Sequence, residues 1–264
     1  MRRLICGLII AAAVFSASPS AFAGTQLVPS YFYPSGSPGP WNVMCDSMGH
    51  TGAGSIAILN PASGPGRSAD PNYSAAIAYC HLDGQRVIGY VATRYTHRSI
   101  GAVEQAVATY YRFYPALDGI FFDTMSLAPN TKASCKGCTM TVASYYSELY
   151  AYVHGTWTNA TVVANPGAPA TTSWQLSTPA ADAVVTFEGS AASYKKYAPP
   201  SWVLAEPAGR IANIIYAAPA SALASICSAA TVDNAGLRYV TDGKLRPNPY
   251  SALPSYWGVE TAGC

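Results

Sequence analysis

The chain has 264 residues, of which only 11% are charged, with 15 basic and 13 acidic side chains. A nearly neutral chain without a basic run gives no reason to expect a nucleic acid or an anionic membrane surface as partner. The sequence holds 19 tyrosines, whose apolar rings and polar hydroxyls suit stacking on sugar rings, although core packing is the simpler explanation for most of them.

Residues 1–23 have the features of a secretory signal peptide. The basic pair Arg2-Arg3 precedes an apolar run over Leu4–Phe15, and Ala21-Phe22-Ala23 matches a small-x-small cleavage site. The alternative, a membrane anchor, needs about 20 apolar residues, and this run is shorter. We therefore expect a mature protein that begins at Gly24, has no membrane anchor, and is secreted, or periplasmic in a bacterial host. Loss of the basic pair leaves 13 basic against 13 acidic residues.

Residues 24–264 fit one domain, because no low-complexity linker divides them. Apolar runs alternate along them with segments of helical periodicity. The predicted strands are Leu27–Tyr33, Ser55–Asn60, Arg86–Ala92, Leu117–Asp123, Thr161–Asn165, Ala183–Glu188, Ile211–Tyr216 and Leu237–Thr241. The predicted helices are Pro71–His81 with Asp70 as its cap, a helix from Ser99 that ends before Pro115, Thr141–His154, Ser190–Tyr197 and Ala220–Ala230. Trp202–Ala205 is an alternative extra strand, and Pro247–Cys264 is a Pro-rich tail.

This alternation predicts the fold class. Strands that alternate with helices form a parallel sheet, and about eight such units predict a single (β/α)8 TIM-type barrel. A doubly wound sheet is the second choice, since no Gly-rich phosphate loop follows the first strand.

Six cysteines follow the signal segment, and an even number in an exported chain predicts disulfides. Sequence alone does not select among the 15 connectivities; we favour the pairing that keeps partners near in sequence, namely Cys45–Cys80, Cys135–Cys138 and Cys227–Cys264. The Cys135-Lys136-Gly137-Cys138 motif also allows a thioredoxin-like redox pair or half a zinc site. No second CxxC and no His pair at ligand spacing accompanies it, so we expect a loop disulfide and no metal.

Polar residues end several of the predicted strands. The fourth strand stops on Asp123 and the sixth on Glu188, while Asn60 and Asn165 end the second and fifth. Because the carboxyl ends of barrel strands meet on one rim, we expect these side chains at a common site.

Asp123 and Glu188 are the candidate catalytic pair, because glycoside hydrolysis commonly needs two carboxyl groups that flank the scissile bond. The alternative is that each acid caps a loop or a helix start. Asp118 and Asp182 lie at the amino ends of their strands. Residues at that face of a barrel serve its stability rather than catalysis, so we interpret both aspartates as structural. The lesser candidates, expected to be loop residues, are Glu206 and Asp242.

Five segments in chain order resemble the spherulin-4 proteins, the spherulation-specific family 4. They are spread over Leu27–Tyr216 and comprise Val28-Pro29-Ser30-Tyr31-Phe32-Tyr33, Ile56-Ala57-Ile58-Leu59-Asn60-Pro61, Val87-Ile88-Gly89-Tyr90-Val91, Asp118-Gly119-Ile120-Phe121-Phe122-Asp123 and Phe187-Glu188. The resemblance implies a (β/α)8 barrel and, in the family's characterised branch, an exported hydrolase that cuts α-1,4-linked galactosamine-containing exopolysaccharide. It also places the family's acids on Asp123 and Glu188.

One position departs from the fungal pattern. Those relatives have a second carboxylate directly after the acid of the fourth strand, and here that position is Thr124. If that acid does chemistry or binds an amino sugar's nitrogen, activity or substrate choice differs in this chain.

The hypothesis from the sequence is an exported, monomeric, endo-acting glycosidase without cofactor or metal. Asp123 is the nucleophile or the stabiliser of an oxocarbenium ion, and Glu188 is the general acid, with a pKa raised by apolar neighbours such as Val185 and Phe187. The side chains expected to line the sugar site, for each of which a structural role is an equal alternative, are Tyr31, Tyr33, Asn60, Tyr90, Asn165 and Tyr216. The rival hypotheses are a non-catalytic polysaccharide-binding or cell-wall-associated barrel and a thiol oxidoreductase.

Overall fold

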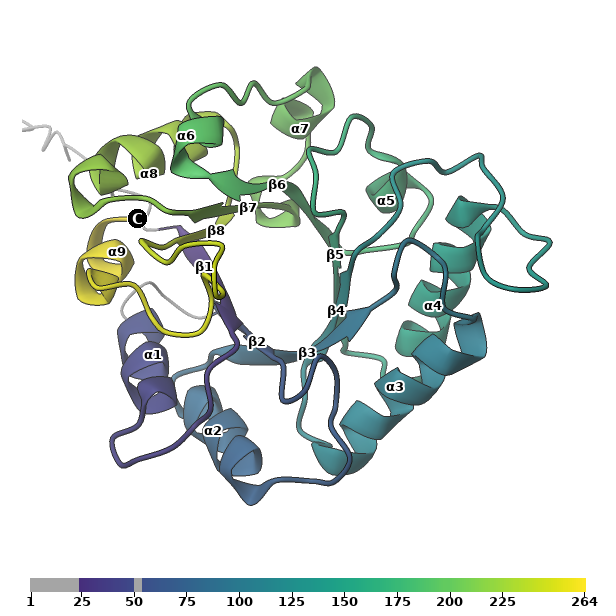
Figure 1. Cartoon of the computed structure of the whole chain (residues 1–264), viewed down its shortest axis with the longest axis horizontal. Helices are drawn as coiled ribbons and strands as arrows, with labels where there is room; N and C mark the ends of the chain where they lie inside the picture. The colour runs from purple at the N-terminus through teal and green to yellow at the C-terminus, as the bar shows by residue number, and fades with distance from the viewer. Residues whose placement is uncertain (1–23, 50–53) are drawn as a thin grey trace, which may run out of the picture.

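Eight parallel strands close into a barrel in chain order in the computed structural model, which describes residues 24–49 and 54–264. Figure 1 shows the ring of strands end-on, with the helices outside it. The strands are β1 Thr25–Ser30, β2 Ile56–Leu59, β3 Arg86–Ala92, β4 Gly119–Asp123, β5 Thr161–Asn165, β6 Ala183–Ser190, β7 Ile211–Tyr216 and β8 Leu237–Val240. The predicted (β/α)8 barrel is confirmed, and the doubly wound sheet is excluded. The predicted signal peptide lies outside the described residues.

The helices connect successive strands and cover the barrel. They are α1 Pro40–Gly49, α2 Pro71–Leu82, α3 Ile100–Phe113, α4 Val142–Thr156, α5 Trp174–Ser177, α6 Ala191–Tyr194, α7 Ser201–Ala205, α8 Leu223–Val232 and α9 Trp257–Gly263. Four of the described helices begin at side-chain caps, because Asp70, Ser99, Thr141 and Ser190 each accept a hydrogen bond from a backbone N–H of the first turn. No helix in the described ranges is long and apolar enough to cross a membrane.

Helices α1, α5, α7 and α9 differ from the sequence predictions, and α5 and α9 fall in segments for which no helix was predicted. The alternative strand at Trp202–Ala205 is wrong: this segment lies in the short helix α7, which buries Val203 and leaves Leu204 53% exposed, while the ring of strands is complete without it. Helix α1 was not predicted, although it buries Trp41, Met44, Cys45 and Met48 at helical spacing. It was not predicted because the preceding Gly/Pro-rich run indicated a loop.

Asp118 and Asp182 hold the amino-end layer of the barrel together, as predicted for structural residues. Oδ2 of Asp118 accepts a hydrogen bond from the backbone nitrogen of Val87 at 2.7 Å, and Oδ2 of Asp182 accepts one from Val162 at 2.7 Å. Each carboxylate is also contacted by a histidine of the neighbouring helix, at 2.8 Å and 3.1 Å. Each aspartate therefore ties its strand to the preceding one.

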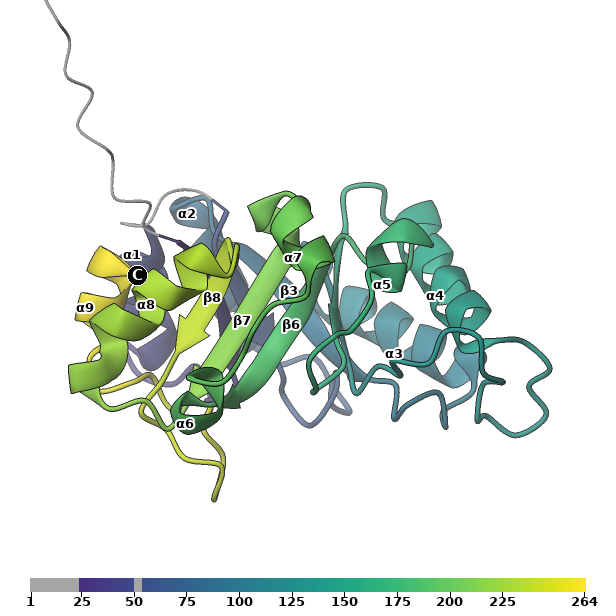
Figure 2. The same ribbon diagram turned by 90° about the horizontal axis from the view of Figure 1, so that it is seen from above.

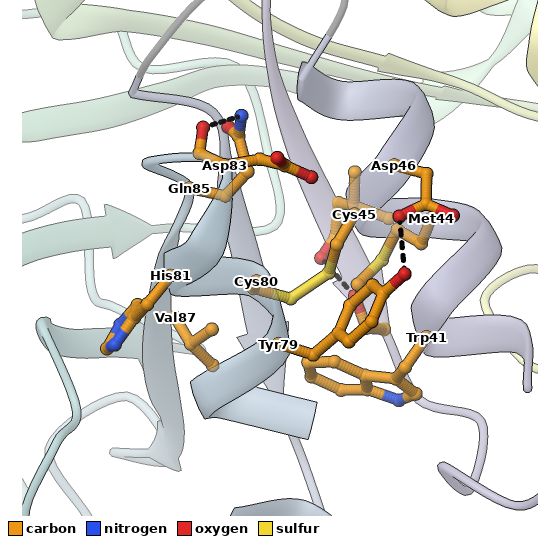
Figure 3. Close-up of a disulfide and its surroundings, with 12 residues drawn as sticks. Trp41, Met44, Cys45, Asp46, Tyr79, Cys80, His81, Asp83, Gln85 and Val87 are labelled. Atoms are coloured by element: carbon orange, nitrogen blue, oxygen red, sulfur yellow. Dashed lines mark hydrogen bonds between the residues drawn. A yellow bond between two sulfur atoms is a disulfide. The ribbon is translucent and has the colours of Figure 1, made fainter. Parts of the chain in front are cut away.

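All three predicted disulfides are present. Cys45–Cys80 joins α1 to α2 across a buried contact that includes Trp41, and Figure 3 shows the neighbouring hydrogen bond from the Tyr79 hydroxyl to Asp46. In the CxxC motif, Cys135 is only 4% exposed and forms a loop disulfide with the half-buried Cys138.

Removing the Cys45–Cys80 bridge is expected to cost stability. Because it links residues 35 positions apart, its loss in the Cys45→Ala/Cys80→Ala variant should lower the free energy of unfolding by about 2–4 kcal/mol. The matched control, Cys135→Ala/Cys138→Ala, opens a loop of only three residues and should cost clearly less. Urea unfolding of both variants measures the difference, and equal losses would contradict this reading.

Candidate active site

Asp123 and Glu188 meet at the carboxyl ends of the strands, bridged by one amide. Nδ2 of Asn165 donates to Oδ1 of Asp123 at 2.8 Å and to Oε2 of Glu188 at 2.7 Å. Because both oxygens contact the same nitrogen, they lie no farther apart than the sum of these distances, about 5.5 Å. The three residues come from β4, β5 and β6, so the predicted convergence of strand ends is what forms this site.

The strand registers explain this arrangement. Asp123 and Asn165 are direct partners in the β4–β5 ladder and therefore lie at the same level of the barrel. Glu188 follows an irregularity in β6, where the register against β7 shifts between Val185 and Phe187. Bulges of this kind are frequent next to active sites, where they re-aim a side chain. The sequence analysis did not predict this irregularity in β6.

Two tyrosines complete the hydrogen bonding of the acids. The Tyr90 hydroxyl donates to Oδ2 of Asp123 at 2.6 Å, and the Tyr250 hydroxyl donates to Oε1 of Glu188 at 2.6 Å. Tyr90 was predicted at the site. Tyr250 was missed, because it lies in the irregular segment between β8 and α9 and has no periodic pattern around it.

Tyr31 lies between these two tyrosines. Its ring packs edge-on against Tyr90 and against Tyr250, with centroids 5.6 Å apart in both pairs. Burial raises the pKa of its hydroxyl, and the charges of Asp123 and Glu188 raise it further. The hydroxyl therefore stays protonated at neutral pH.

Burial raises the pKa of both acids. For Asp123, hydrogen bonds from Tyr90, from the backbone of Thr124 and from Asn165 oppose this rise. For Glu188, hydrogen bonds from Tyr250 and Asn165 oppose it, while the charge of Asp123 adds to it. Asp123 thus has one more donor to stabilise its anion, and Glu188 is the better placed of the two to hold a proton.

The predicted role of Phe187 in raising that pKa needs a correction. Its ring packs against Tyr194 and Tyr197 of the segment after β6, at 4.8 Å and 4.9 Å between centroids. Because side chains alternate along a strand, Phe187 and Glu188 face opposite sides of β6. The groups that contact the Glu188 carboxyl are Tyr250 and Asn165.

Thr124 holds a loop beside the site. Its backbone has a left-handed φ of 52°, and its hydroxyl donates to the Asp123 carbonyl oxygen at 2.7 Å and accepts from the Arg94 backbone nitrogen at 2.8 Å. The loop that follows β3 has three successive residues with positive φ, from Arg94 to Thr96. Thr124 therefore fastens this strained loop next to Asp123.

The other predicted sugar-site residues lie further out on the rim. Oδ1 of Asn60 accepts from the Gly64 backbone nitrogen at 2.9 Å and shapes the loop after β2. Tyr33 is 47% exposed and its hydroxyl donates to Asp70 at 2.9 Å. Tyr216 ends β7 and lies close enough to Tyr250 to raise the pKa of that hydroxyl.

The lesser candidates have structural partners. Glu206 forms an ion pair with Arg210 at 2.9 Å, and Asp242 accepts hydrogen bonds from Ser255. Within residues 24–49 and 54–264, no three His, Cys, Asp or Glu side chains are grouped so as to hold a metal ion.

Comparison with known proteins places the chain in a family. A model of the spherulation-specific family 4 matches residues 25–262. Spherulin-4 of Physarum polycephalum is 29% identical over 247 residues, which are 89% of this chain and 68% of that protein. The crystal structure of Aspergillus clavatus Sph3 in complex with GalNAc has the same fold, with a TM-score of 0.68 at 24% identity over 90% of this chain and 96% of that one. The chain belongs to the spherulation-specific family 4.

Proposed function

We propose that the protein is a secreted, endo-acting glycoside hydrolase that cleaves an exopolysaccharide of α-1,4-linked galactosamine or N-acetylgalactosamine. The observation that supports this most is the pair of half-buried carboxyl groups, Asp123 and Glu188, bridged by Asn165 at the mouth of the barrel. The family relationship and the GalNAc bound to the Aspergillus clavatus protein support the choice of sugar. Three disulfides agree with an exported protein.

In this proposal the two acids have different roles. Glu188 protonates the glycosidic oxygen, since its pKa is raised by burial and by the nearby charge of Asp123. Asp123, with three donors on its carboxylate, stays ionised and attacks or stabilises the anomeric carbon. After the leaving sugar departs, the deprotonated Glu188 takes a proton from the incoming water.

The spacing of the acids predicts the stereochemistry. Carboxyl groups about 5–5.5 Å apart are typical of retaining enzymes, and about 6.5–9.5 Å of inverting ones. The nearest oxygens here lie within about 5.5 Å, so we expect the α-configured sugar as the first product. Proton NMR of the anomeric signals during the first minutes of hydrolysis measures this. An initial β-anomer would assign an inverting reaction and refute direct attack by Asp123.

A non-catalytic polysaccharide-binding barrel is the second candidate, and Thr124 favours it. The fungal pattern that the sequence resembles has an acid at this position, whereas here the Thr124 hydroxyl is hydrogen-bonded to backbone groups of Asp123 and Arg94. If that acid is indispensable, this chain binds the polymer without cutting it.

Incubation with N-acetylated and de-N-acetylated galactosamine polymers distinguishes the candidates. We expect new reducing ends from at least one polymer, because both proposed catalytic groups are in place. Binding of the same polymers is measured in parallel by co-sedimentation. Binding without any release of reducing ends would reject the hydrolase and support the binding barrel.

A further inference from the structure

The C-terminal segment 241–256 forms part of the barrel mouth. Strand β8 pairs with β1 over only two residue pairs, Thr25 with Leu237 and Gln26 with Arg238, whereas β1 pairs with β2 over four. Beyond the last pair, the segment takes the space beside β1 and β8, as the yellow trace in Figure 1 shows. In Figure 2 it reaches past the end of β8 on the side where α6 lies, which is the side of the carboxyl ends of the strands.

A buried carboxyl group in α9 holds the end of this segment against β8. Glu260 of α9 has no exposed surface, and its Oε1 accepts a hydrogen bond from the backbone nitrogen of Val240 at 2.6 Å. The side chain thus satisfies a backbone donor of β8 that β1 does not reach. The Cys227–Cys264 disulfide fastens the end of α9 to α8.

Further contacts fix the segment along its length. The Ala217 nitrogen donates to the Gly243 carbonyl at 2.8 Å, and the Tyr256 hydroxyl donates to the Ala218 carbonyl at 2.8 Å. Gly243 is packed so closely against Pro249 that an added Cβ would lie 2.3 Å from the Pro249 carbonyl oxygen. The segment is therefore held in one shape, although it has no regular secondary structure.

The conformation of this segment places the Tyr250 side chain next to Glu188. Tyr250 is 7% exposed, its hydroxyl lies 2.6 Å from Oε1 of Glu188, and its ring contacts those of Tyr31 and Tyr239. Burial and the Glu188 charge raise the pKa of this hydroxyl far above its usual range. The hydroxyl therefore keeps its proton, and its hydrogen bond to Glu188 favours the ionised form of the acid.

We propose that Tyr250 is a positioning residue for the general acid, holding Glu188 in its reactive orientation and stabilising the carboxylate that remains once the proton has been given to the leaving group. This inference rests on the proposed function, in which Glu188 is the acid. The bond that forms is between the Glu188 proton and the glycosidic oxygen, and the electron pair of the broken C–O bond stays with that oxygen. Tyr250 keeps its own proton throughout.

The other groups that face Glu188 come from three strands. Asp123 of β4 faces it as a second carboxylate, and Asn165 of β5 donates to it. Tyr31, just beyond the end of β1, lies close enough to both acids for their charges to raise the pKa of its hydroxyl. Tyr216 of β7 lies close enough to Tyr250 to raise the pKa of its hydroxyl slightly. Tyr90 is the matching donor for Asp123, which supplies an internal comparison.

Tyr250→Phe and Tyr90→Phe should shift opposite limbs of the pH profile of kcat/KM. Loss of the Tyr250 donor raises the pKa of Glu188, so the acid keeps its proton to higher pH and the basic limb moves up by about one pH unit. Loss of the Tyr90 donor raises the pKa of Asp123, which must be ionised, so the acidic limb moves up by a similar amount. The first variant broadens the profile and the second narrows it.

Tyr256→Phe is the control in the same segment, since its hydroxyl fastens the segment but contacts neither acid. We expect its pH profile to match that of the wild type. If Tyr250→Phe also keeps the wild-type profile, the tyrosine does not act on the acid and the inference fails. If Tyr250→Phe moves the acidic limb instead, Glu188 is the ionised nucleophile and the proposed role of Tyr250 is equally wrong.

A readout without turnover separates this inference from the proposed function. In protein labelled with carboxyl-¹³C glutamate, the Glu188 signal is identified by its loss in Glu188→Gln, and its titration gives the pKa directly. A higher pKa in Tyr250→Phe than in the wild type supports the inference even if no polymer is cut. An unchanged pKa overturns it even in an active enzyme.

Discussion

Glu188→Gln is expected to lower kcat on the polymer by about 10²–10⁴-fold, the usual contribution of a general acid. The loss should be much smaller on an α-linked galactosamine oligosaccharide with an acidic phenol as leaving group, because that group departs without a proton. Asp123→Asn should lose activity on both substrates, since its carboxylate acts at the anomeric carbon. Initial rates on the two substrates test this, and equal losses in both variants would remove the assignment of Glu188 as the acid.

The same substitution should not weaken the fold. The pKa of Glu188 is raised in the folded protein, so the folded state binds its proton more tightly than the unfolded state. The contribution of this proton to the free energy of unfolding is then lost as the pH rises through the pKa that Glu188 has in the folded state. Gln cannot ionise and avoids this loss, so the free energy of unfolding at neutral pH should equal or exceed that of the wild type. A large decrease would mean that the lost activity reflects misfolding.

Asn165→Asp is expected to abolish activity at neutral pH and to destabilise the protein by about 3 kcal/mol, the scale of an uncompensated buried charge. Asn165 is 3% exposed and contacts both carboxylates through one nitrogen. An acid there places three carboxyl groups together, so at least one must take up a proton.

The pH dependence of stability distinguishes repulsion among the three carboxylates from the simple loss of the Asn165 amide. The crowded acids of Asn165→Asp have raised pKa values, so its stability deficit should be greatest at neutral pH and should shrink as the pH falls through those values. Asn165→Ala removes the same donor without adding charge, and its deficit should change less with pH. Urea unfolding of both variants in acidic and neutral buffer measures this, and parallel curves would argue against repulsion.

The barrel was predictable because each strand has its own signal. The ranges of β3, β5 and β7 match the predictions residue for residue, since these runs are apolar and bounded by turn residues. Strand β1 ends earlier than predicted, at Ser30, where the Tyr31 nitrogen turns back to the Pro29 carbonyl. The disulfides were predictable because each joins two cysteines that are consecutive among the six.

The site was only partly predictable, because its pieces depend on different physical information. Asp123, Glu188 and Asn165 stand at strand ends, where the pattern indicates them. Tyr250 reaches Glu188 from 62 residues away along an irregular segment, and only the buried Glu260 and the packing of that segment determine its place. Contacts of this kind leave no periodicity in the sequence.

Release of reducing ends from α-1,4-linked galactosamine polymers by the wild type, Asp123→Asn and Glu188→Gln side by side tests the central claim most directly. The account predicts release by the wild type and loss of at least about 10²-fold in both variants, with all three proteins folded. Wild-type rates in either variant, or no release by the folded wild type, would contradict it.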